Sequence, residues 1–257
     1  MTPLSVVIIT LNEERNIGRC LASVAGIADD VVVVDSGSTD RTGDICHEFG
    51  ARFITHPWLG FVETKNFANA QSKYPLILSL DADEALSEEL YASILAVKET
   101  SVENAFTMNR LTNYCGKWIR HCGWYPDRKI RLFNRNQARW TGLVIHETLT
   151  VEPGIKVKHL EGDLQHYSYY TVTDHIAQAN RFTDLTAEEA FRKGKRAVIA
   201  QILFKPPVRF ARDYFFKLGF LDGYYGFIVC RISAQATFYK YIKLRQLNAG
   251  ACFNHKK

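Results

Sequence analysis

The chain has 257 residues, enough for one large α/β domain or a domain with an extension, and its 47% hydrophobic content suffices for a full core. Its net charge of +5 is uneven, because residues 1–191 carry 18 Lys/Arg and 25 Asp/Glu, whereas residues 192–257 carry 14 and 2. The six cysteines form no CxxC pair, which disfavours a disulfide framework. No signal-peptide pattern opens the sequence and no apolar run reaches the ~20 residues of a membrane span, so we expect neither export nor a transmembrane anchor.

Four short apolar runs alternate with helical segments over the first hundred residues. Apolar side chains recur at helical spacing between the runs, as at Ile17, Leu21 and Val24. A strand followed by a helix, repeated, predicts an α/β fold with a parallel sheet and right-handed crossovers. The predicted strands are residues 5–10, 31–34, 51–56 and 74–80.

Acidic side chains follow two of these strands directly. Asp35 ends the second strand, and the cluster Asp81, Asp83 and Glu84 follows the fourth. The carboxyl ends of parallel strands face one ligand crevice, so we expect these acids to converge there. In an extended segment residues i and i+2 point the same way, and two such carboxylates suit Mg²⁺ or Mn²⁺ held jointly with substrate phosphates.

Some of the acidic residues in this region also have a purely structural interpretation. Asp35 is a suitable cap for the helix that follows it. Acids favour a helix N-terminus, which accounts for Glu88 and Glu89 but leaves Asp81 and Asp83 unexplained. Neither GxGxxG nor GxxxxGK[ST] occurs in the chain, which argues against a dinucleotide oxidoreductase and a P-loop ATPase.

Three motifs at the strand ends carry a family resemblance. TLNEE (10–14), VVDSGSTDRT (33–42) and SLDADE (79–84) resemble, in order and spacing, family 2 of the inverting glycosyltransferases. The resemblance implies a GT-A fold: a Rossmann-like, mostly parallel sheet with a small antiparallel annex and, here, a C-terminal helical extension. It also implies a nucleotide-sugar donor, with UDP-sugar as co-substrate, and a divalent metal on its diphosphate.

The same resemblance assigns expected roles to individual side chains. Three residues of the first motif, Thr10, Asn12 and Glu13, would border the nucleoside. Asp35 would contact uracil or ribose, Asp81 the ribose side, and Asp83 the metal.

After residue 100 the alternation of strands and helices stops. Residues 104–114, 128–135 and 138–151 are short, strand-like and rich in arginine and aromatic side chains, which predicts an antiparallel annex over the crevice that holds the acceptor. Inverting transfer requires a base to deprotonate the acceptor hydroxyl. Glu147, in GLVIHE, resembles the acid of an HE pair in this branch of the family; alternatively, it pairs with an arginine such as Arg131.

Four further residues are candidate contacts of phosphate or acceptor. His146 is a second candidate base, although a lone histidine beside a strand is more often structural. The arginines suit bidentate contacts with the leaving diphosphate or an acceptor phosphate, and at least one of them is expected only to solvate the surface. They are Arg128, Arg131 and Arg135.

The last third of the chain is helical, basic and aromatic. We expect a GT-A domain over residues 1–170, with a nucleotide half to about residue 100 and an acceptor half to 170, followed by an extension over 171–257 that Pro206 and Pro207 break. Residues 192–257 of this extension hold 13 of the 32 aromatic residues and an excess of twelve positive charges. These features favour an anionic membrane surface as partner; the alternative is a core helix with solvated charges.

The chain as a whole, including WTGLVIHE and FLDGYYGF, resembles the lipopolysaccharide core β-1,4-glucosyltransferases of this family. The resemblance implies glucose transfer from UDP-glucose to inner-core heptose, at the cytoplasmic face of a bacterial inner membrane. Alternatives are another bacterial glycan or a lipid-linked acceptor. A sugar nucleotidylyltransferase would need a Gly-rich phosphate loop that is missing here. The alternative from another functional class is a nucleic-acid-binding protein that uses its basic C-terminal arm. We expect no nucleic-acid partner.

Overall fold

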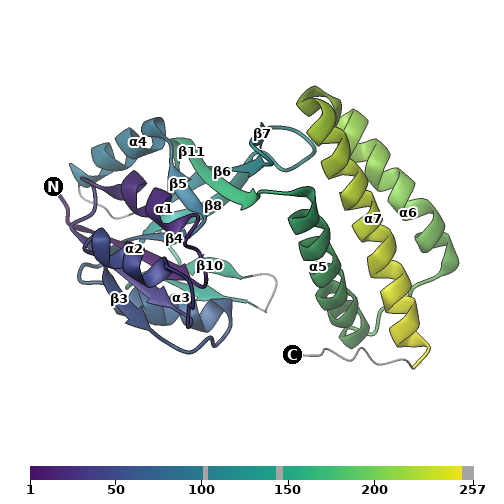
Figure 1. Ribbon diagram of the computed structural model, residues 1–257, viewed down its shortest axis with the longest axis horizontal. Helices are drawn as coiled ribbons and strands as arrows, with labels where there is room; N and C mark the ends of the chain where they lie inside the picture. Colours follow the sequence, from purple (N-terminus) through teal and green to yellow (C-terminus); the bar gives the residue numbers. More distant parts are fainter. Residues whose placement is uncertain (101–103, 143–146, 251–257) are drawn as a thin grey trace. The chain divides into compact units, whose positions relative to one another are not determined.

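The computed structural model describes residues 1–100, 104–142 and 147–250 (Figure 1). The chain divides into two compact units. Unit 1 comprises Met1–Leu111 and Pro126–Tyr167, and unit 2 comprises Thr112–Tyr125 and the chain from Ser168 onward. The sequence placed a boundary near residue 170; the structure also assigns a short internal segment to the second unit.

A large mixed sheet organises unit 1. Its strand order is β3-β2-β1-β4-β8-β6-β11-β5. The first four strands are parallel neighbours, as the alternation of strands and helices predicted. They are β1 (Leu4–Thr10), β2 (Asp30–Asp35), β3 (Arg52–Thr55) and β4 (Leu76–Asp81). β1 and β4 are buried almost throughout, which is why they consist of apolar runs.

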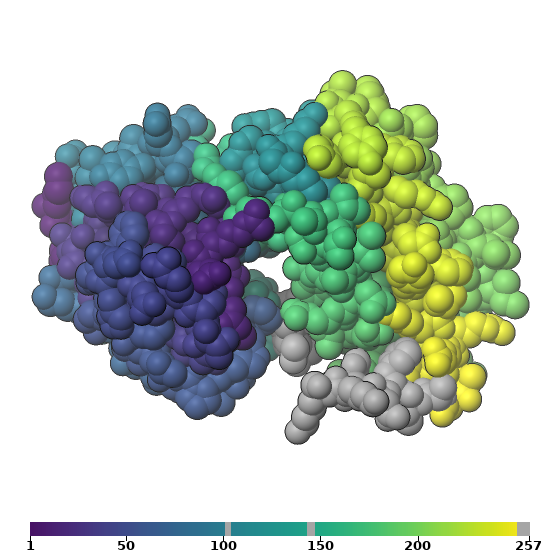
Figure 2. Space-filling model, in the orientation of Figure 1, coloured from purple at the N-terminus to yellow at the C-terminus, as the bar shows by residue number. Residues whose placement is uncertain are grey.

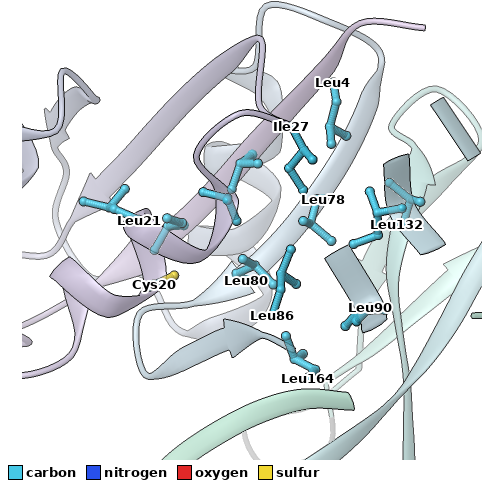
Figure 3. Close-up of a cluster of buried hydrophobic side chains, with 14 of the residues drawn as sticks. Leu4, Cys20, Leu21, Ile27, Leu78, Leu80, Leu86, Leu90, Leu132 and Leu164 are labelled. Atoms are coloured by element: carbon cyan, nitrogen blue, oxygen red, sulfur yellow. The ribbon is translucent and has the colours of Figure 1, made fainter. Parts of the chain in front are cut away.

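Helices connect the parallel strands and cover them. They are α1 (Ile17–Val24), α2 (Thr42–Glu48) and α3 (Phe61–Ala70), followed by α4 (Glu88–Lys98) after β5. α1 buries Cys20 and Leu21 in the cluster that also holds Leu78 and Leu80 of β4 (Figure 3). Burial of one such leucine contributes about 1.5–3 kcal/mol, so this helix fixes the position of the loop that precedes it.

Antiparallel strands complete the sheet. β4 pairs with β8 and β8 with β6, both antiparallel. The β6 and β11 strands run from unit 1 into unit 2. The antiparallel elements of the large sheet are β5 (Glu84–Leu86), β6 (Ala105–Tyr114), β7 (Lys117–Ile119), β8 (Asp127–Asn134) and β11 (Val157–Tyr169). A separate two-stranded sheet joins β9 (Ala138–Thr141) to β10 (Thr148–Val151). The predicted fold class is thus confirmed.

Unit 2 is a helical body built on the tip of β6. α7 (Gly223–Asn248) lies between α5 (Val172–Arg192) and α6 (Ile199–Ala211), as Figure 1 and Figure 2 show. A π-helical turn, η1 (Arg212–Phe216), and a 3-10 helix, η2 (Gly219–Asp222), connect α6 to α7. The core of unit 2 gathers buried side chains from both of its chain segments: Tyr114, Ile119, Cys122, Val229 and Cys230.

The expectation that Pro206 and Pro207 break the helical region was wrong. Both lie inside α6, and the break falls earlier, between Arg192 and Ile199. None of the residues of α6, all of them described, is buried. Water can therefore solvate the carbonyl groups that the two prolines leave unpaired, which lowers the cost of an internal proline. Among the described residues, no helix is both long and apolar enough to cross a membrane.

Candidate active site at the carboxyl edge of the parallel strands

Strand register brings the ends of β2, β1 and β4 to one edge of the sheet. Thr10 of β1 pairs with Asp35 of β2, and Ile9 pairs with Asp81 of β4. Neighbouring strands lie about 4.8 Å apart, so the backbones at Asp35 and Asp81 are about 10 Å from each other across β1. The acidic strand ends therefore share one edge, as parallel pairing predicted.

The loops after β1 and β2 are joined by hydrogen bonds into one rim. The Asn12 side-chain oxygen accepts the Thr39 N–H at 2.8 Å, and the Asn12 N–H donates to the Ser38 hydroxyl at 2.7 Å. The Glu13 N–H donates to the Thr42 hydroxyl at 2.8 Å. Asn12 has φ +54°, in the left-handed region that asparagine tolerates better than most residues. The TLNEE and VVDSGSTDRT motifs thus form a single preorganised rim.

Asp35 lies at the base of this rim, where its carboxylate accepts hydrogen bonds from the turn that follows it. One carboxylate oxygen accepts the N–H groups of Gly37 at 2.9 Å and Ser38 at 2.8 Å, and the other accepts the Ser38 hydroxyl. The residue is 2% exposed. Asp35 therefore binds its own turn and does not cap the following helix as the structural interpretation expected, because α2 begins at Thr42 and has no side-chain cap. A contact of Asp35 with uracil or ribose stays a prediction.

Thr10 and Glu13 lie beside this base. The Thr10 hydroxyl is buried and has no hydrogen-bond partner among the described residues, which is unusual for a buried polar group. The Glu13 carboxylate accepts a bond of 2.7 Å from the Asn16 amide. Burial raises the pKa of Glu13, the Asn16 bond opposes that shift, and the negative charge of Asp83 adds to it. Glu13 and Asp83 are therefore close enough to influence each other.

Asp81 is held between two cations. The Lys65 ammonium lies 2.9 Å from one carboxylate oxygen, and the Arg131 guanidinium lies 2.7 Å from the other. Arg131 also lies 2.6 Å from Glu84, whose second oxygen accepts the Asp81 N–H at 2.9 Å. Burial alone would raise the pKa of Asp81, but attraction to Arg131 and then to Lys65 outweighs it and holds that pKa well below its usual range. Asp81 is therefore ionised at neutral pH.

This arrangement shows what Arg131 contacts. The residue is 3% exposed and engaged with Asp81 and Glu84, so it neutralises these buried acids, and a contact with the leaving diphosphate stays a prediction. The alternative pairing of Arg131 with Glu147 is not what the structure shows, because Glu147 lies beside Lys65.

Asp83 occupies the turn between β4 and β5 rather than an extended segment. The expectation that Asp81 and Asp83 point the same way as strand neighbours therefore does not apply. β5 pairs with β11, which brings the His166 ring to 3.1 Å from the Asp83 carboxylate. Burial would raise the pKa of Asp83, but attraction to His166 and the hydrogen bond from it lower it overall.

The Asp83 carboxylate is a suitable ligand for Mn²⁺ or Mg²⁺, whereas the imidazole beside it suits Mn²⁺ better than Mg²⁺. Among the described residues, no group of three His, Cys, Asp or Glu side chains is arranged to hold a metal. Asp83 and His166 fit a divalent cation that takes its remaining oxygens from diphosphate and water, the usual way in which Mg²⁺ is bound with a nucleotide.

Glu147 directly precedes β10 and is 3.8 Å from the Lys65 ammonium. Lys65 is 3% exposed and also lies 4.5 Å from the centre of the Trp140 ring. One ammonium thus contacts both the strand-end acid Asp81 and the candidate base Glu147. His146, the second candidate base, lies outside the described residues.

The remaining two arginines lie in different places. Arg128 is exposed on β8, where it pairs in register with Asn109 of β6, and its expected phosphate contact stays a prediction. The Arg135 N–H donates to the Pro75 carbonyl, before β4 begins, and its guanidinium binds carbonyl groups at the end of α3. The six residue-to-residue steps from Pro75 to Asp81 span about 20 Å when extended. The structure therefore places Arg135 at the opposite edge of the sheet from Asp81, away from the site.

Sequence reasoning missed Lys65 and His166. Lys65 did carry a signal, because Phe61, Lys65 and Ala68 recur at the spacing of one helix face, and a lysine on a buried face needs an acidic partner. His166 carried none. Its position depends on the pairing of β5, only three residues long, with β11, more than 70 residues later.

Comparisons with known proteins identify the family. The model of glycosyl transferase family 2 matches residues 5–161. The lipopolysaccharide core biosynthesis glycosyltransferase LpsC of Rhizobium meliloti is 31% identical over 96% of this chain and 93% of its own length. An uncharacterized glycosyltransferase of Rickettsia typhi is 31% identical over 96% of this chain and 88% of its own.

Among solved structures, glucosyl-3-phosphoglycerate synthase from Mycobacterium tuberculosis, in complex with Mn²⁺, UDP and glucosyl-3-phosphoglycerate, matches 44% of this chain and 44% of that one. The match has 24% identity and a TM-score of 0.36. The family match covers the parallel sheet, the acidic strand ends, Lys65 and Glu147. The chain is a glycosyltransferase and belongs to glycosyl transferase family 2.

Proposed function

We propose that this enzyme transfers a hexose, with glucose from UDP-glucose as the first candidate, to the heptose of the lipopolysaccharide inner core. The likeness to LpsC over nearly the whole of both chains supports this acceptor class. We further propose that the reaction takes place at the cytoplasmic face of the inner membrane. The single observation that carries the chemistry is the Lys65 ammonium between Asp81 and Glu147.

The donor would bind at the rim made by the TLNEE and VVDSGSTDRT motifs. The buried Thr10 hydroxyl, which lacks a partner among the described residues, offers a hydrogen bond to the nucleoside. Asp83 and His166 would hold a divalent cation, which when bound supplies positive charge to the departing diphosphate. Lys65 adds a second positive charge on the side of Asp81.

Glu147 is the proposed base. Its carboxylate would accept the proton of the acceptor hydroxyl while that oxygen forms a bond to the anomeric carbon. The bond from the anomeric carbon to the diphosphate oxygen breaks on the opposite face, so the configuration inverts and UDP leaves. Lys65 would keep the Glu147 carboxylate beside the donor pocket through their ion pair.

A coupled assay of UDP release tests this proposal. Purified enzyme, UDP-glucose, Mn²⁺ and a deacylated heptose-containing core oligosaccharide should release UDP and yield an elongated oligosaccharide by mass spectrometry. Glu147→Gln should bind UDP as the wild type does, while turnover falls at least about a hundredfold. Glu152→Gln, an exposed glutamate just after β10, is the matched control and should retain full turnover.

Two results would contradict the proposal in different ways. Full turnover of Glu147→Gln would remove Glu147 from the mechanism but leave the family chemistry intact. Release of UDP from another UDP-sugar but not from UDP-glucose, or onto another glycan but not onto heptose, would overturn the proposed substrates. Asp83→Asn should lose metal-dependent turnover, and Asp44→Asn, an exposed acid on α2, should not.

A further inference from the structure

The helical rod formed by α6 and η1 in unit 2 exposes large apolar side chains along its length. Exposed fractions reach 66% at Phe204, 65% at Val208 and 83% at Phe216. α6 continues directly into η1, and Ile199, Leu203 and Phe215 extend the same exposure along the rod. We call these six residues the apolar ridge: Ile199, Leu203, Phe204, Val208, Phe215 and Phe216.

Other side chains of the rod account for its attachment to the rest of unit 2. Phe210 and Tyr214 pack against the cluster that holds Val229 and Cys230 of α7. The Lys205 ammonium bonds to the Tyr241 hydroxyl of α7. The rod therefore packs through these side chains, while the six residues of the apolar ridge stay exposed. Large apolar side chains exposed together on a protein surface mark an interaction site.

Charge identifies the partner of the ridge. Residues 193–250, all of them described, contain eleven Lys/Arg and only two acids, Asp213 and Asp222. Asp213 is 1% exposed and paired with Arg209 and Arg212. Asp222 is 4% exposed and accepts bonds from His121 and from two backbone N–H groups. The charges that this segment shows to solvent are therefore positive only.

A helical surface with exposed apolar side chains and cationic side chains near them complements a bilayer with anionic headgroups. Apolar side chains enter the boundary between headgroups and acyl chains, while lysine and arginine remain among the phosphates. Lys195 and Arg196, both exposed, lie in the segment just before α6, and exposed Lys217 directly follows Phe216. Cationic side chains thus stand at both ends of the apolar ridge.

We propose that the apolar ridge of α6 and η1 lies in the interface of an anionic phospholipid bilayer, with Phe215 and Phe216 as the inserted side chains at one end. The ridge would dock the enzyme in the plane of the membrane without crossing it. This inference deepens the proposed membrane location, but it does not depend on the donor, the acceptor or the base, because no residue of the ridge belongs to the candidate active site.

Vesicle sedimentation of the full chain tests the proposal. Wild-type protein should sediment with vesicles of phosphatidylglycerol and phosphatidylcholine in equal parts at low salt, and weakly or not at all with phosphatidylcholine alone. Phe215→Ser/Phe216→Ser should lower the partition coefficient at least about tenfold. Phe49→Ser, a 48% exposed phenylalanine in unit 1, is the matched control and should not change it.

A charge variant separates the two parts of the interaction. Lys195→Gln/Arg196→Gln should lower binding to the anionic vesicles by about fivefold for each charge removed, and added salt should weaken wild-type binding in the same way. All variants change exposed side chains, so their melting temperatures and their turnover with a water-soluble acceptor should match those of the wild type. Loss of either property would identify a folding defect, and the milder single variant Phe216→Ser then decides the matter.

Three results would overturn the proposal. The first is a wild-type chain that stays in the supernatant with anionic vesicles at low salt. The second is Phe215→Ser/Phe216→Ser or Phe216→Ser binding as tightly as Phe49→Ser. The third is a lipid-free dimer, seen by analytical ultracentrifugation, that these substitutions dissociate, because a second copy would then cover the ridge.

Discussion

Replacement of Arg131 by methionine tests whether the acidic strand end depends on a buried counter-charge. Methionine keeps most of the side-chain length and removes the guanidinium. Arg131 lies 2.7 Å from Asp81 and 2.6 Å from Glu84, and Glu84 is fully buried. The nearest other cations are Lys65, at 2.9 Å from Asp81, and Arg110, at 3.8 Å from Glu84. Removal of one partner from a buried ion pair costs about 3–5 kcal/mol, because the remaining charge is left uncompensated.

The cost should depend on pH in a defined direction. Arg131 and Lys65 hold the pKa of Asp81 below its value in the unfolded chain, so Asp81 stabilises the wild type above an unfolded pKa of about 3.9. That contribution is lost as pH falls through the depressed folded pKa. In Arg131→Met the depression is smaller, so the deficit relative to the wild type should be largest near neutral pH and shrink as pH falls through the folded pKa of Asp81 in the variant.

Urea unfolding at about pH 7 and about pH 3 measures both effects. The free energy of unfolding of Arg131→Met should fall by about 3–5 kcal/mol at the higher pH and by clearly less at the lower pH. Arg128→Met is the matched control: it lies on the same strand but is exposed, and should change stability by less than about 0.5 kcal/mol. A deficit below about 1 kcal/mol, or an equal deficit at both pH values, would refute the reasoning.

Three further predictions concern the site and its support. Lys65→Met should lower turnover at least about a hundredfold, because the ammonium beside Asp81 and Glu147 is lost; steady-state kinetics against the exposed Lys73→Met measures this, and equal turnover of the two would exclude Lys65 from the reaction. His166→Gln should raise the Mn²⁺ concentration needed for half-maximal turnover, and a chelator should abolish wild-type turnover until Mn²⁺ is restored; unchanged titration of the variant would rule out His166 as a ligand. Gly162→Ala should destabilise unit 1 by about 3 kcal/mol or more, because the added Cβ would lie 2.3 Å from the Leu90 nitrogen. The control Gly154→Ala is also at φ +94° but has open space around it, so it should cost only about 1–2 kcal/mol. Comparable losses of stability in thermal unfolding of the two variants would contradict this.

The parallel half of the fold followed from local pattern. Residues 5–10 and 74–80 are apolar runs followed by polar turns. A short apolar run of this kind is buried on both faces when it forms a central strand of a parallel sheet. The strand ends at Asp35 and Asp81 then had to share an edge, because parallel strands all present the same end there. The local sequence pattern predicts where these residues lie, but it does not predict what they bind. Asp35 proved to hold its own turn, which a single sequence cannot distinguish from a ligand contact.

The features that were missed depend on pairing across long stretches of chain. Arg135 was expected near the diphosphate, but antiparallel pairing of β8 with β4 carries it to the far edge of the sheet. His166 reaches Asp83 only through the register of a three-residue strand. Such registers are decided by packing of the whole sheet, and no local periodicity reports them.

The composition of unit 2 from two separate stretches of chain has a consequence for how this protein can be shortened. Tyr114, Ile119 and Cys122 come from the hairpin at the tip of β6, yet they are buried by helices that begin at residue 172. A truncation after residue 170 would therefore not release an intact catalytic domain. It would leave the hairpin with its aromatic and thiol side chains facing water, and the shortened protein should aggregate unless that hairpin is trimmed as well.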